Sequence, residues 1–145
     1  MTPIRTIHPD FEEYLHLKPT ECIELFVDLR NLVLELYPDA NEILYHTHAL
    51  TAVFSISEKL SDAFCMIPIY SKHLNLGFNK GTLLADKTNL LQGTGKLIRH
   101  IPIATTVDYR NDAVKELLNN AIELAISDMK KPSKVSSNTI SKIKK

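Results

Sequence analysis

The stretch LLQGTGKLIRHIPI, residues 90–103, decides whether this chain has a nucleotide-binding loop followed by a helix or a turn followed by a strand. Its centre, GTGK, is similar to a phosphate-binding loop, in which backbone N–H groups, a lysine and the first turn of a helix hold phosphates. That motif needs GxxxxGK and then Ser or Thr, but Leu90 stands at the first glycine position and Leu97 at the hydroxyl position. The residues that follow alternate and include Pro102, so they predict a strand instead of a helix. We therefore do not expect a nucleotide-binding loop here.

Other extended segments precede this stretch. Residues 41–57 are rich in β-branched and aromatic residues, and KHLNLGF alternates strictly between apolar and other residues. Pro68 indicates a sheet edge or a strand end. Together these patterns predict five strands, at residues 43–47, 50–57, 63–70, 72–78 and 96–103. The long connection over residues 79–95 is expected to be a loop with one helical turn near residues 87–91.

Helical periodicity flanks the strands. Residues 20–36 carry one apolar stripe, with Thr20 as the expected N-cap and Pro38 as the stop signal. A shorter helix over residues 10–17 is expected to precede it. A second apolar stripe, with Asn111 or Asp108 as its cap, consists of Val114, Leu117, Leu118, Ala121, Ile122, Ala125 and Met129.

This order of elements predicts an α+β fold. We expect an antiparallel sheet of about five strands, with the N-terminal and C-terminal helices packed on one face. A chain of 145 residues suits a single domain, which we place at residues 1–130. Residues 131–145 contain five lysines and no acidic residue, and we expect them to form a flexible, solvated tail.

The charge distribution argues against nucleic-acid binding. The net charge is zero, but the five tail lysines leave 12 basic against 17 acidic side chains in residues 1–130. Such an acidic body does not suit a protein that neutralises phosphates. No segment has the length of a membrane span or the apolar core of a signal peptide. Cys22 and Cys65 lie far apart without a CxxC motif, which is typical of a cytoplasmic protein with ordinary thiols.

The glycine-rich stretch also has a second interpretation, as an anion-binding surface. If the two ends of the loop lie close together on neighbouring strands, cationic side chains and loop N–H groups would line a concave site. The residues concerned, between positions 79 and 100, are Lys80, Gly93, Gly95, Lys96, Arg99 and His100. In the alternative, the glycines only let the chain turn and the cations only face solvent.

The pattern over residues 20–126 resembles the YdhG-like small domains of bacteria, a largely uncharacterised family. It is carried by NKGTLL, LLQGTGK and RHIPI, after a helix that runs into LYPDANEILYHTHALT. The matching residues are Pro38, Ala40, Glu42, Gly81, Asp86, Leu91, Gly93, Gly95, Lys96, Arg99, His100 and Ile101. The resemblance implies an α+β fold distantly similar to frataxin, and some members of the family are described as iron chaperones. It supplies no catalytic residues, and HTH at residues 46–48 departs from the glycine- or proline-containing stretch of many members.

Two residue groups are candidates for metal binding. His46 and His48 would share one face of a predicted strand, a spacing at which two imidazoles bind one ion. Glu21, Glu24 and Asp28 form a carboxylate row beside the apolar stripe of the first long helix, and carboxylates suit iron. We give more weight to ordinary roles, on a polar sheet face and on a solvated helix face.

Three functions remain open from the sequence. The first is a binding or accessory module for a small anionic ligand at residues 79–100. The second is frataxin-like metal handling, and the third is an interaction module, such as a homodimer formed through an uncovered sheet face or an edge strand. Cys65 is expected to be a buried, unreactive thiol. The sequence contains no GxSxG, HExxH or CxxC motif and defines no cofactor, so whether the chain is an enzyme stays open.

Overall fold

A six-stranded sheet forms the centre of the structure, a computed structural model that describes residues 2–129 and 137–144. The strand order is β5-β4-β3-β2-β1-β6. The strands are β1 (Asn41–His46), β2 (Leu50–Ser55), β3 (Ala63–Ile69), β4 (Leu74–Phe78), β5 (Arg99–Ile103) and β6 (Thr139–Ser141). The helices are α1 (Pro9–Leu15), α2 (Thr20–Leu36) and α3 (Asp112–Asp128), with short 3-10 turns at Leu60–Asp62, Gly81–Leu83 and Thr106–Asp108. The predicted α+β class is therefore confirmed.

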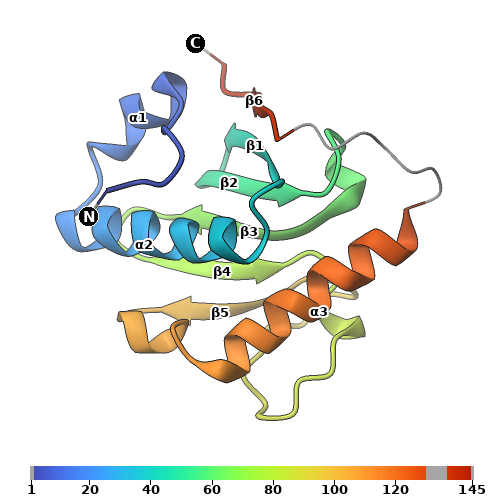
Figure 1. The fold of residues 1–145 in the computed structure, drawn as a ribbon. Coiled ribbons are helices and arrows are strands. Elements are labelled where there is room, and N and C mark those ends of the chain that lie inside the picture. The colour runs from blue at the N-terminus through green and yellow to red at the C-terminus, as the bar shows by residue number, and fades with distance from the viewer. Residues whose placement is uncertain (1, 130–136, 145) are drawn as a thin grey trace.

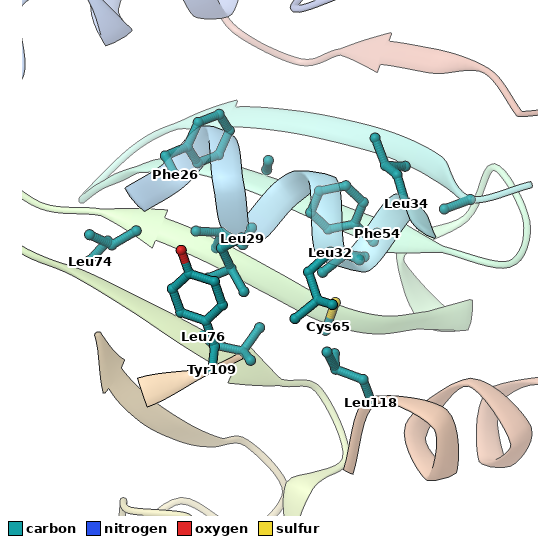
Figure 2. Packing of buried hydrophobic residues seen from close by; sticks show 14 of the residues in the cluster. Phe26, Leu29, Leu32, Leu34, Phe54, Cys65, Leu74, Leu76, Tyr109 and Leu118 are labelled. Carbon is teal, nitrogen blue, oxygen red and sulfur yellow. The ribbon is translucent and has the colours of Figure 1, made fainter. Parts of the chain in front are cut away.

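The helices cover one face of the sheet, with α2 and α3 side by side over the central strands (Figure 1). Strand alternation turns Leu74, Leu76 and Phe78 towards these helices, and all three are buried, as the sequence predicted. Figure 2 shows Phe26, Leu29 and Leu32 of α2 against the sheet, with Leu118 of α3 at the opposite end of the cluster from Phe26. Each such buried side chain contributes roughly 1.5–3 kcal/mol, so this layer dominates the stability of the fold.

The ends of the long helices follow from local signals. α2 ends at Leu36, two residues before Pro38, as predicted. Its N-cap is Pro19, which makes no side-chain cap bond, so Thr20 is the first helical residue and not the cap. Asn111 caps α3, and its side chain accepts a hydrogen bond from Val114 N at 2.9 Å. None of the helices in the described ranges is long and apolar enough to cross a membrane.

The structure decides between the two alternatives for Pro68 and moves the helical turn of the long loop. Strand β3 lies between β2 and β4, and Pro68 is next to its last residue, so the strand-end alternative is confirmed and the sheet edge is not. The helical turn of the long loop is at Gly81–Leu83 and not at residues 87–91. There the Asp86 carboxylate instead accepts hydrogen bonds from Leu90 N at 2.9 Å and Leu91 N at 2.8 Å, which fixes a non-helical turn.

The sheet has a sixth strand, which the sequence interpretation placed in the flexible tail. β6 pairs with β1 in parallel, so the sheet is mixed and not purely antiparallel. Its three residues are too few to show a strand pattern in the sequence, and contacts with distant residues hold it in place. Residues 130–136 and 145 of the predicted tail lie outside the described residues.

The N-terminal residues form a strap across α2. Asn31 accepts a hydrogen bond from Ile4 N at 3.0 Å, and its side-chain amide donates to Thr2 O at 2.9 Å. Arg5 donates to Ala40 O at 2.7 Å and so joins the strap to the start of β1. The middle of α2 is consequently buried all round, whereas its apolar stripe predicted burial on one side only.

Candidate anion-binding surface

The two ends of the loop over residues 79–98 lie against each other. Thr82 N donates to Leu97 O at 3.0 Å, and Thr82 Oγ1 donates to Lys96 O at 2.9 Å. Gln92 and His100 exchange two backbone hydrogen bonds, at 2.8 and 2.9 Å. These bonds close the loop beside the start of β5, an edge strand of the sheet.

Two glycines allow this close approach. A Cβ atom on Gly81 would lie 2.5 Å from Arg99 Cβ and 2.9 Å from Arg99 N, so the arginine backbone occupies the space of a side chain. Gly93 has φ +124°, a conformation that favours glycine. A Cβ atom there would lie 3.4 Å from Arg99 Cδ and 3.6 Å from His100 Nδ1. The structure therefore brings Gly93, Arg99 and His100 together.

Arg99 is held from one side only. Its Nη1 donates to the carbonyl oxygens of Gly95 and Ile98, the latter at 3.0 Å. Within the part of the chain that the structure describes, no hydrogen bond involves Arg99 Nε or Nη2. A guanidinium has five N–H donors in one plane, so the group is positioned by the loop and still presents donors.

The other predicted cations differ in their position. Lys80 Nζ forms an ion pair with Asp128 Oδ2 at 2.6 Å, which directs this lysine towards α3. The side chain of Lys96 is exposed and follows the glycine bend directly. The glycine–arginine surface, as we name it, therefore consists of Gly93, Gly95, Lys96, Arg99 and His100, and Lys80 lies apart from it. Its glycines and lysine are exposed while Arg99 and His100 are half-buried, so it is a surface and not a deep cleft.

The predicted carboxylate row lies in a groove elsewhere, between α2 and the turn after β5. This groove has a volume of about 240 Å³ and is lined by Glu21, Glu24, Leu25, Asp28, Ala104 and Thr106. Asp28 is occupied by protein donors: its Oδ2 accepts from Tyr109 OH at 2.6 Å and from Arg110 Nε at 2.9 Å. Arg110 Nη2 donates to Asp28 Oδ1 at 2.8 Å. Hydrogen bonds from Arg110, and after it from Tyr109, lower the pKa of Asp28 although burial opposes them.

The two histidines of the HTH stretch do not share a strand face. β1 ends at His46, and His48 lies in the turn that joins β1 to β2. The His46 ring packs against Tyr14 of α1, with ring centroids 4.1 Å apart. Among the described residues, no group of three or more His, Cys, Asp or Glu is placed to hold a metal ion.

Both cysteines are buried and unpaired. Burial raises the pKa of the Cys65 thiol well above its usual range, and burial is also the largest cause of the raised pKa of Cys22. The predicted burial of Cys65 is therefore confirmed, and a buried thiol with a raised pKa is expected to be unreactive.

Two buried polar networks were not found from the sequence. Arg30 and Glu42 form an ion pair between α2 and β1, and Asp28 joins α2 to Tyr109 and Arg110. Neither pair has a local spacing that reveals it, because the partners are 12 and 82 residues apart. The one available signal was the presence of charged residues inside otherwise apolar segments, at Arg30 and Asp28 of the helix over residues 20–36.

Gly81 and Gly95, two of the glycines in the loop, give a matched pair of variants. Gly81→Ala should lower the free energy of unfolding by about 1–3 kcal/mol, because the added methyl overlaps the Arg99 backbone. Gly95→Ala should cost less than about 1 kcal/mol, because its nearest neighbour, Ile98 O, lies 3.7 Å from the added atom. Urea denaturation of the two variants checks this, and equal losses would contradict the packing described here.

Comparisons with models of protein families, with curated proteins and with solved structures find no match to this chain. The resemblance to YdhG-like domains, with the frataxin-like fold and the iron handling that it implies, therefore stays a prediction.

Proposed function

We propose that this chain is a small binding module that holds an anionic group, such as a phosphate or a carboxylate, at the glycine–arginine surface. The observation that supports this function is the state of Arg99. Two carbonyl groups of its own loop hold Nη1, whereas no group among residues 2–129 and 137–144 accepts a hydrogen bond from Nε or Nη2.

The chemistry of Arg99 suits an oxyanion. A planar guanidinium forms two parallel hydrogen bonds to the oxygens of a phosphate or carboxylate, and hydrogen bonds of this kind contribute roughly 1.5–3 kcal/mol when charged. Because the loop already fixes the side chain, little rotamer entropy is lost on binding. Lys96 adds a second positive charge next to the bend, and Gly93 and Gly95 are exposed beside it.

The exposure of this surface limits its affinity for a free ion. Water and salt screen charges that are open to solvent, so we expect binding of inorganic phosphate near the millimolar range, weakening as the ionic strength rises. The net negative charge of residues 1–130 further disfavours anions away from these local cations. A physiological ligand would add contacts beyond its anionic group.

A titration of inorganic phosphate, followed by amide chemical shifts at constant ionic strength, tests the proposal. We expect shifts confined to residues 92–100 and at least tenfold weaker binding in Arg99→Lys, which keeps the charge and loses the planar pair of donors. Lys87→Ala is the matched control, because it removes a cation from the same loop whose partner is Glu116, at 3.1 Å.

The control should bind phosphate as the wild type does. Equal affinity of Arg99→Lys and the wild type, or shifts spread over many surface amides, would show that phosphate does not bind at Arg99. Unchanged amide positions outside the loop would confirm that each variant is folded.

A further inference from the structure

The chain's own C-terminal segment pairs with β1 on the side that β2 does not cover. Residues 139–141 pair in parallel with residues 42–44. The pairing continues at both ends, because Glu42 N donates to Asn138 O at 2.9 Å and Lys142 N donates to Leu44 O at 2.8 Å. Figure 1 shows this short strand at the edge of the sheet farthest from β5.

Side chains on both faces of the segment contact specific partners. Asn138 N donates to Asn41 Oδ1 at 2.9 Å, and Ser141 Oγ donates to Asp10 Oδ2 of α1 at 2.7 Å. Ile143 is buried in the main core with an exposed fraction of 8%. Ile140 packs on the opposite face, against a small cluster formed by Ile43, Val53 and Ala63. The β1 edge therefore selects both the backbone direction and the pattern of side chains of a strand that binds it.

The attachment of this segment is small compared with the rest of the fold. β6 pairs with β1 through three residues, and two isoleucines anchor it. Strands β1 to β4, in contrast, lie next to one another in the centre of the sheet. Segments with few buried contacts open locally without unfolding of the whole domain. When this one opens, the N–H and C=O groups of β1 form an unpaired edge, which is a template for another strand.

We propose that the β1 edge is an exchangeable strand-binding site, and that two copies of this chain associate by reciprocal exchange of residues 138–143. The occupant is a second copy because another copy carries the segment that fits this edge in direction, register and side chains. In the exchanged dimer every contact described above is kept and only the connection to α3 changes. Nine residues separate Asp128 from Asn138, enough to span on the order of 30 Å when extended.

The closed monomer prevails in dilute solution. A segment tethered to its own site has a local concentration in the millimolar range, so a second copy competes only when the chain is concentrated. The edge lies across the sheet from the glycine–arginine surface, so this inference does not depend on anion binding.

The first test measures binding of a fluorescent peptide, residues 137–144, to full-length protein. We expect at least tenfold tighter binding to Ser141→Asp than to the wild type, because the new carboxylate faces Asp10 and weakens the tethered strand. Ile143→Asn, which removes the core anchor, should give the same gain. The control peptide carries Asn in place of both isoleucines and should not bind.

The second test is light scattering on the full-length chain as its concentration is raised. The wild type should form dimers near millimolar concentration, and Ser141→Asp should stay monomeric, since its segment fits neither its own edge nor that of a neighbour. Circular dichroism shows whether each variant is folded. If folded variants bind the peptide no better than the wild type does, or if the wild type stays monomeric, the strand-exchange proposal is wrong.

Discussion

Replacing Arg30 with alanine should lower the free energy of unfolding by about 3–5 kcal/mol, because it leaves the Glu42 carboxylate charged and buried without its partner. Both side chains are almost fully buried, with exposed fractions of 1% and 2%. Arg30 Nε donates to Glu42 Oε2 at 2.7 Å, and Arg30 Nη2 donates to Glu42 Oε1 at 2.9 Å. Urea denaturation, analysed with the same m-value for the variant and the wild type, measures the loss in the free energy of unfolding.

The same arginine also holds the N-terminal strap. Its Nη1 donates to Arg5 O at 2.6 Å and its Nη2 to Thr6 O at 3.3 Å. Proteases should therefore cut the Arg30→Ala variant within its first residues. They should not cut the Glu42→Gln variant there, because that variant keeps Arg30. The double variant Arg30→Met/Glu42→Leu removes both charges together and should lose less stability than Arg30→Ala alone.

An exposed ion pair provides the control for this prediction. The side chains of Lys87 and Glu116 have exposed fractions of 73% and 53%, so Lys87→Ala should cost less than about 1 kcal/mol. If Arg30→Ala is no more destabilising than Lys87→Ala, the buried pair does not contribute as its geometry indicates.

The parts of the fold that the sequence predicted are those encoded by neighbouring residues. Strict alternation over residues 74–78 and the apolar stripe of α2 each arise within one element, and both were confirmed. β6 was missed because its strand character comes from Asn41, Leu44 and Asp10, which are distant in sequence. For Pro68 the sequence left a sheet edge and a strand end open, and only the structure decides for the strand end, because the pairing of β3 depends on β4, which follows it in the chain.

The candidate surface was only partly predictable. The glycine bend and the strand after it have local signals, and the structure brings Gly93, Arg99 and His100 together, while their binding of an anion stays a prediction. Lys80 could not be placed from sequence, because its partner Asp128 is at the end of α3, 48 residues away. The shared strand face expected for His46 and His48 was wrong, because β1 stops at His46 and His48 lies in the turn before β2.

The buried ion pair and the exchangeable strand meet at one residue. The side chain of Glu42 pairs with Arg30 of α2, while its backbone N–H donates to Asn138 at the start of the C-terminal segment. The ion pair thus fixes β1 against the helix layer and so fixes the edge that β6 recognises.

Asp28→Asn should change the response of stability to acid more than any other single carboxylate substitution on α2. The pKa of Asp28 in the folded protein is lowered from its usual 3.8, first by hydrogen bonds from Arg110. A group with a lowered folded pKa stabilises the fold fully above its unfolded pKa, and this contribution is lost as the pH falls through the folded value. The wild type should therefore lose stability below about pH 4, and Asp28→Asn should lose less there.

Tyr109 gives the opposite dependence at high pH. Burial raises the pKa of this phenol above its usual 10.0, and its hydrogen bond to Asp28 raises it further. Because the folded pKa is raised, this contribution is complete below about pH 10 and is lost as the pH rises through the folded value. Tyr109→Phe should abolish this contribution to the alkaline loss. It should keep most of the acid loss, because the pKa of Asp28 is lowered first by Arg110 and only to a smaller extent by Tyr109.

Urea midpoints measured from pH 2 to 5 and from pH 9 to 11 separate these contributions. At neutral pH, Asp28→Ala should cost about 2–4 kcal/mol, because it leaves the buried Tyr109 hydroxyl and the guanidinium of Arg110 without their acceptor. Glu24→Gln is the matched control, an exposed carboxylate on the same helix and groove, and should follow the wild type at every pH. If Asp28→Asn loses stability in acid as the wild type does, another carboxylate controls acid unfolding. The Asp28–Arg110 pair would then join α2 to the start of α3 without setting the pH dependence of stability.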